Sequence, residues 1–144
     1  MDPEIRRPMA MKNKNLLDQI LPNVQFAVHD GGIATELEHV GGVLDKHLWS
    51  AISAETQPDK LKQVHRLYLE SGCNILTTAS YQFSFEAFQM HKNLDRDEAE
   101  RILLKSVQIC DEARREYLNE HPEVNRSILI AASLSCYGAS IGSH

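Results

Sequence analysis

The sequence predicts an α/β fold with a parallel sheet, because short apolar strands alternate with amphipathic helices. Three segments rich in β-branched and aliphatic residues have the length of strands, namely 24–28, 74–78 and 127–133. Segments with helical periodicity lie between them. Strands that alternate with helices pair in parallel through right-handed crossovers. A doubly wound sheet and a (β/α)8 barrel both satisfy this order.

The helices that follow the first strand carry start and stop signals. A helix over 33–40 stops at a Gly-Gly pair. The next helix has Pro58 in its first turn and ends at Gly72, which are the residues favoured at those two positions. A short helix is expected over 84–90.

The longest helix is expected to begin at Asp95, which forms a capping-box pattern with Glu98 three residues later. Pro122 ends it. Its apolar stripe is expected to be buried, and the charged residues between the stripe positions are expected to face solvent. The stripe consists of Ala99, Ile102, Leu103, Val107, Cys110, Ala113 and Tyr117.

Composition places the chain among globular proteins of one domain and favours a small-molecule ligand. The chain has 144 residues, of which 42% are hydrophobic and 24% charged. Its net charge of −5, without a basic run, argues against nucleic acid or an anionic membrane as the partner. The chain has three cysteines at wide spacing, Cys73, Cys110 and Cys136. An odd number of cysteines suits a reducing compartment better than a disulfide framework, so we expect a cytoplasmic location.

The first 14 residues have neither the pattern of a signal peptide nor that of a membrane span. Residues 1–14 are therefore expected to form a mobile leader, and 15–144 to form the domain. A short amphipathic helix is expected over 16–21, directly before the first strand.

We expect a functional site where the first strand ends, at Asp30-Gly31-Gly32. Glycines at this position let a ligand approach the backbone N–H groups closely. The dinucleotide pattern G-x-G-x-x-G is missing from this position, and Asp30 and Glu36 would repel a phosphate. The junction therefore suits an ammonium or a neutral polar group.

Polar residues also follow the other two strands. Thr78 and Ser133 would open on the same face as Asp30 if the strands are parallel, and barrel enzymes place their sites on that face. The residues by themselves show no nucleophile paired with a base, so they predict only a small-molecule site. Trp49, the single tryptophan, has two interpretations that stay open, core packing and a pocket wall.

Several blocks, read together, resemble the homocysteine S-methyltransferase family from about Val24 to the end of the chain. The resemblance covers only the front portion of that family. The blocks are, in order, DGGIATELE at 30–38, LWS at 48–50, QVH at 63–65, Gly72, and TTASYQ at 77–82.

The resemblance implies a (β/α)8 TIM barrel, of which this chain supplies roughly the first three βα units. Members transfer a methyl group from a sulfonium donor, such as S-methylmethionine or S-adenosylmethionine, or from a betaine, to homocysteine, and methionine is formed. Zinc holds the acceptor thiolate and lowers its pKa.

The resemblance also implies roles for particular residues. Asp30 and the backbone at Gly31 would hold the amino-acid end of homocysteine, Thr78 would add a hydroxyl contact, and Trp49 would line the pocket. The resemblance assigns no catalytic residue in this chain.

The chain departs from the family in two places. The family holds zinc with three cysteines near its carboxyl end, and no residue here matches them, so we expect the ligands downstream of this chain. Where the family has Gly-Pro-Tyr-Gly, this chain has Ser135-Cys136-Tyr137-Gly138, which puts the geometry of that loop in doubt. The difference also places a thiol near the expected site.

Three strands would leave an unpaired apolar edge, because a barrel of this kind closes with eight. We therefore expect the chain to be a fragment, an alternative product or one portion of a longer chain, and to be inactive alone. The remainder of the barrel or another chain would cover the edge. The alternative is a catalytically inactive truncated paralogue that acts as an amino-acid-binding or protein-interaction module.

Overall fold

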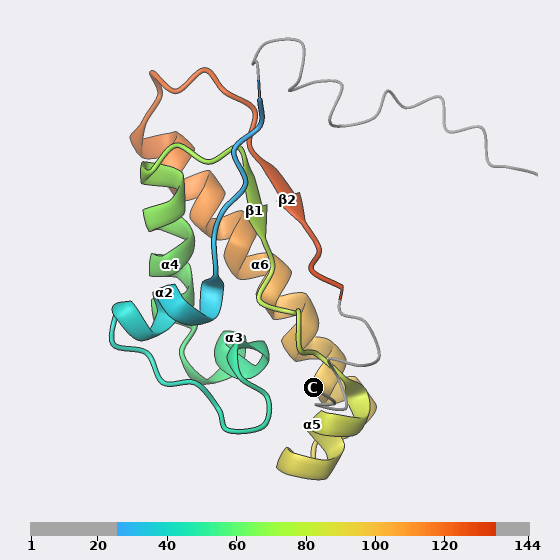
Figure 1. Ribbon diagram of the computed structural model, residues 1–144. Helices are drawn as coiled ribbons and strands as arrows, with labels where there is room; N and C mark the ends of the chain where they lie inside the picture. Colours follow the sequence, from blue (N-terminus) through green and yellow to red (C-terminus); the bar gives the residue numbers. More distant parts are fainter. Residues whose placement is uncertain (1–25, 135–144) are drawn as a thin grey trace, which may run out of the picture.

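A computed structural model describes residues 26–134 of the chain. The predicted leader 1–14, the predicted helix 16–21 and Cys136 lie outside the described residues. Figure 1 shows the arrangement of the elements, which are, in order, α2 (Ile33–His39), η3 (Ser50–Ile52), α3 (Ser53–Thr56), α4 (Pro58–Glu70), β1 (Ile75–Thr77), α5 (Phe85–Lys92), α6 (Arg96–Glu120) and β2 (Leu129–Ala131).

The sheet of the described part is parallel, as predicted. Strands β1 and β2 pair with Leu76 opposite Ile130, and α5 and α6 form the crossover between them. Leu76 is fully buried in a cluster with Leu69 of α4 and Cys110 of α6. Both helices therefore cover the same face of β1, and Figure 1 shows α6 running behind the sheet.

The predicted first strand is reduced, within the described residues, to a short alignment beside β1. Val28 accepts hydrogen bonds from Asn74 and Ile75, and the N–H of Asp30 donates to Ile75, but a bridge forms only between His29 and Ile75. Regular parallel pairing would next join the N–H of Thr77 to the carbonyl of Asp30. That N–H donates to the Asp30 carboxylate instead, at 2.6 Å, so the side chain ends the strand.

The helix signals of the sequence are confirmed. Asp95 and Glu98 form the predicted capping box, with both hydrogen bonds at 2.8 Å. Pro58 is the first residue of α4, and Gly72 follows that helix with a φ of +95°, a conformation that glycine adopts without strain. Local chemistry therefore determines where these helices begin and end.

The predicted stripe of α6 is correct except at Val107, which is 40% exposed, and at Leu103, which is only partly buried. Ser106 and Ile109 lie on the buried side instead. Ser106 is tolerated there because its hydroxyl accepts a hydrogen bond from the N–H of Ala79, at 2.9 Å. A polar residue thus joins α6 to the chain that leaves β1.

Within residues 26–134, no helix is both long enough and apolar enough to cross a membrane.

Candidate functional site

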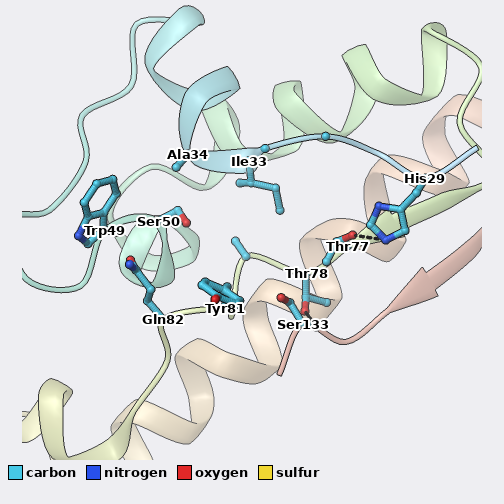
Figure 2. A pocket seen from close by; sticks show the side chains of 13 residues that line it. His29, Ile33, Ala34, Trp49, Ser50, Thr77, Thr78, Tyr81, Gln82 and Ser133 are labelled. Carbon is cyan, nitrogen blue, oxygen red and sulfur yellow. Dashed lines mark hydrogen bonds between the residues drawn. The ribbon is translucent and has the colours of Figure 1, made fainter. Parts of the chain in front are cut away.

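A pocket of about 350 Å³ lies at the carboxyl ends of the strands, which is where barrel enzymes place their sites. Its walls come from four parts of the chain: the end of the first strand with the start of α2, the start of η3 with the residue before it, the end of β1 with the segment after it, and Ser133 after β2 (Figure 2). The lining residues are His29, Gly31, Gly32, Ile33, Ala34, Trp49, Ser50, Thr77, Thr78, Ala79, Tyr81, Gln82 and Ser133.

Asp30 lies directly behind this lining, and its side chain is fully buried. Its Oδ2 atom accepts the N–H of Thr77 at 2.6 Å, and its Oδ1 atom accepts the hydroxyl of the same residue at 2.5 Å. The carboxylate thus ties the end of the first strand to β1.

His29 fills the space between Asp30 and the pocket. Its Nδ1 atom lies 2.9 Å from the carbonyl oxygen of Asp30 and 3.1 Å from Oδ1. Its Nε2 atom lies 3.1 Å from the hydroxyl oxygen of Thr77, the contact drawn as a dashed line in Figure 2. The ring is 55% exposed, so a histidine covers the buried carboxylate on its solvent side.

Thr78 takes part in a closed ring of hydrogen bonds. Ser80 donates its hydroxyl proton to the carbonyl of Ser133 at 2.8 Å, and the N–H of Ser133 donates to the Thr78 oxygen at 3.0 Å. The remaining contact, 2.6 Å between the two hydroxyls, must therefore use the Thr78 proton. Thr78 can still accept one hydrogen bond from a ligand, but it has no proton left to donate.

Gly31 and Gly32 form a backbone lip over the pocket. A Cβ atom on Gly31 would lie 2.9 Å from the hydroxyl oxygen of Tyr68, which itself donates to the carbonyl of Gly32 at 3.2 Å. The N–H groups of Gly31 and Gly32 are both without an acceptor in the described part of the chain.

The loop that carries Trp49 is fixed by Asp45. These two residues exchange backbone hydrogen bonds, and the Asp45 carboxylate accepts the N–H groups of His47 and Leu48, each at 2.9 Å. Burial by itself would raise the pKa of Asp45, but Lys92 and the two N–H groups lower that pKa to about 2. Asp45 is thus a charged anchor for the loop.

Trp49 lies at the opposite end of the pocket from His29 (Figure 2). Its backbone has φ 48° and ψ −126°, a conformation that few residues other than glycine adopt, and its side chain is exposed enough to contact a ligand. The structure thus favours the pocket-wall interpretation over core packing.

The sequence did not identify every residue that the pocket presents. The TTASYQ block contains three further lining residues, Thr77, Tyr81 and Gln82. Membership of that block is the sequence signal that could have identified them. Ser50 is likewise part of the LWS block. His29 had no such signal, because it precedes the Asp-Gly-Gly motif and its partners lie on β1.

Comparisons with known proteins agree with this geometry. The homocysteine S-methyltransferase family model matches residues 27–143. The chain belongs to the homocysteine S-methyltransferase family.

Individual relatives give the extent of the likeness. Homocysteine S-methyltransferase 3 of Zea mays is 46% identical over 116 residues, which cover 78% of this chain and 34% of the maize protein. Homocysteine S-methyltransferase 1 of Arabidopsis thaliana is 42% identical over 138 residues, covering 91% of this chain and 42% of that protein.

The same likeness extends to three-dimensional structure. The metallated form of the homocysteine methyltransferase MmuM from Escherichia coli superimposes with a TM-score of 0.83 and 34% identity, over 90% of this chain and 44% of that one. The chain thus spans between a third and a half of the length of these homocysteine methyltransferases.

The described residues do not fit the zinc ion that the family implies. They contain no group of three or more histidine, cysteine, aspartate or glutamate residues able to hold a metal. Cys73 and Cys110 are buried, and burial raises the pKa of their thiols to about 11 and about 12. Both cysteines belong to the apolar cluster that contains Leu69 and Leu76, so they are core residues.

Proposed function

We propose that this chain carries the acceptor-binding part of a homocysteine S-methyltransferase. In this proposal residues 15–144 belong to a (β/α)8 barrel whose first three strands are the segment 26–30, β1 and β2. The observation that carries the proposal is the pocket at the carboxyl ends of these strands, in a chain that belongs to the family.

The amino-acid end of homocysteine would bind at the Asp30 end of the pocket. The N–H groups of Gly31 and Gly32 have no acceptor among the described residues and would donate to the carboxylate of the ligand. Oδ1 of Asp30 would accept the ammonium group, and Thr78 would accept one further hydrogen bond. The two charges of the ligand would thus meet complementary groups.

The methyl donor would bind toward the opposite end. Trp49 lies at that end and is 48% exposed, and Tyr81, which is 53% exposed, lies between Trp49 and Thr78 (Figure 2). An aromatic face attracts a cation such as the sulfonium of S-methylmethionine. In the reaction the thiolate of homocysteine attacks the donor methyl carbon. A new carbon–sulfur bond forms, the bond to the sulfonium breaks, and a neutral thioether leaves. Zinc would have to be held by residues other than the described ones.

The outer edge of β2 is free among the described residues, and its three residues are only partly buried. We propose that further barrel strands, from the same chain or another, pair with this edge.

The test is formation of methionine from homocysteine, with S-methylmethionine, S-adenosylmethionine and betaine compared as donors. Asp30→Asn should weaken homocysteine binding by about 1–3 kcal/mol, the range for a charge-assisted hydrogen bond. Asp59→Asn, in the first turn of α4 and outside the pocket, is the matched control. Unchanged affinity in Asp30→Asn would assign Asp30 a purely structural role.

The same assay distinguishes the non-enzymatic alternative. Because the described residues do not fit zinc, this comparison uses the chain joined to further barrel strands. If that longer product binds homocysteine with an affinity sensitive to Asp30, yet forms no methionine with any of the three donors, it acts as an amino-acid-binding module.

A further inference from the structure

We infer that His29 occupies, in the ligand-free chain, the place on Asp30 that the ammonium group of an amino-acid ligand takes, so that ligand binding displaces the imidazole. The inference rests on the proposed function, since it concerns the same end of the same pocket. It makes His29 an internal competitor of the ligand.

The hydrogen bonds of the ring support this role. Both atoms near Nδ1, the carbonyl oxygen and Oδ1 of Asp30, can only accept, so Nδ1 carries a proton and donates it. Thr77 donates its own hydroxyl proton to Oδ1. The contact of Nε2 with Thr77 is therefore a hydrogen bond only when Nε2 also carries a proton. The ring thus presents an N–H donor to Asp30 at the position where an ammonium group would present one.

The two oxygens of Asp30 have different partners. Oδ2 accepts the backbone N–H of Thr77 and holds the carboxylate in the sheet. Oδ1 accepts from side chains only, namely the Thr77 hydroxyl and the His29 ring. Departure of the ring would free a position on Oδ1 while Oδ2 keeps the carboxylate in place.

The surroundings allow the exchange. The His29 side chain is 55% exposed and lies at one end of the pocket, next to glycines that add no side-chain bulk (Figure 2). Asp30 is fully buried, and among the described residues no lysine or arginine forms an ion pair with it. A buried carboxylate needs a compensating partner, so the place that the ring leaves must be taken by another donor, and a cationic donor compensates the charge best.

The other charged or titratable groups around this end do not replace the ring. Strands β1 and β2 contribute no ionisable side chain, since their sequences are Ile-Leu-Thr and Leu-Ile-Ala. Helix α4 contributes Tyr68, whose hydroxyl donates to the carbonyl of Gly32, and α2 contributes Glu36, which is an anion. The ligand ammonium is thus the cation available to take the place of the imidazole.

This competition has a measurable consequence. A ring that occupies the ligand's place lowers the apparent affinity for the ligand, and the reduction grows with the fraction of molecules in which the ring is bound there. His29→Leu removes both ring nitrogens but keeps an apolar side chain of similar reach. We expect it to bind L-methionine about tenfold more tightly than the wild-type chain. His39→Leu, which changes a histidine of α2 outside the pocket, should leave the affinity unchanged.

The experiment is calorimetric titration of the wild-type chain and both variants with L-methionine and with 4-(methylthio)butanoate, which lacks the ammonium group. The gain in His29→Leu should appear for methionine and not for the desamino analogue. In the wild-type chain, the ring C–H resonance of His29, assigned by its loss in His29→Leu, should shift as methionine binds. This second readout does not depend on the folding of any variant.

The outcomes separate this inference from the proposed function. Equal or weaker methionine binding by a folded His29→Leu chain, or a His29 resonance that does not move as methionine saturates, would overturn the exchange and leave the proposed function intact. Failure of both the wild-type chain and His29→Leu to bind methionine would overturn both.

Discussion

The carboxylate of Asp30 replaces a backbone carbonyl in the sheet, because it accepts the N–H of Thr77 where regular parallel pairing would use the carbonyl of Asp30 itself. The strand ends there for that reason. The same two residues also share the hydroxyl hydrogen bond, so one carboxylate holds two donors of β1.

This relationship predicts unequal effects of two substitutions. Asp30→Ala leaves the N–H of Thr77 without its acceptor and should lower the free energy of unfolding by about 1–3 kcal/mol. Thr77→Val keeps that N–H paired and should cost less, about 1 kcal/mol. Urea denaturation measures both. A larger loss in Thr77→Val than in Asp30→Ala would contradict the interpretation.

The strained backbone of Trp49 predicts a difference between two truncations. Both Trp49→Ala and Trp49→Gly remove the indole, but glycine adopts a φ of 48° more easily than alanine does. Trp49→Gly should therefore be more stable than Trp49→Ala by about 1 kcal/mol, although glycine has more freedom in the unfolded chain. Thermal unfolding of the two variants side by side tests this, and a more stable alanine variant would show that the loop relaxes.

Ser106 is predicted to stabilise the junction of α6 with the segment after β1. Ser106→Ala leaves the buried N–H of Ala79 without an acceptor and should cost about 1–3 kcal/mol of stability. Ser71→Ala is the matched control, because its hydroxyl is exposed and donates to a carbonyl one helical turn earlier, at Leu67. The control should change the free energy of unfolding by about 0.5 kcal/mol at most.

The buried ring of His65 should make the folded chain less stable in acid. The ring is fully buried, neither nitrogen has a partner among the described residues, and burial lowers its pKa from 6.5 to about 4. Between those values the unfolded chain takes up a proton that the folded chain does not. Stability should therefore fall by about 3 kcal/mol as the pH drops from 6.5 to 4.

The control compares how strongly the stability of two histidine variants depends on pH. In His65→Leu the stability should depend much less on pH across this window, whereas His39→Leu should keep the full dependence. Urea midpoints at pH 7, 6 and 5 measure it. A wild-type chain whose midpoint does not change between pH 7 and pH 5 would show that the ring gains a partner when it is protonated.

Cys73 and Cys110 are predicted to be unreactive in the folded chain. Burial raises the pKa of both thiols, to about 11 and about 12, and the thiolate is the form that reacts. In a Cys136→Ser background, a thiol reagent at pH 7.5 should label neither cysteine within minutes, and should label both in 8 M urea, about the concentration that unfolds most domains. Fast labelling without urea would mean that this part of the core opens.

Much of the fold could be predicted from the sequence alone, because the signals involved are local. The capping box at Asp95, the proline of α4 and the glycine at position 72 act within one or two helical turns. The family blocks also located the pocket, since Gly31, Trp49 and Thr78 all line it.

The tertiary structure decided which hydrogen-bonding groups the pocket still has free. Asp30 and Thr77 are 47 positions apart in the chain, and Thr78 and Ser133 are 55 apart. No periodicity connects such pairs, because they meet only when two strands align. The sequence by itself determined the four longer helices of the described part, the parallel order and the family. The folded chain determined that the Asp30 carboxylate and the Thr78 proton are already in use, and that His29 stands between the buried carboxylate and the pocket.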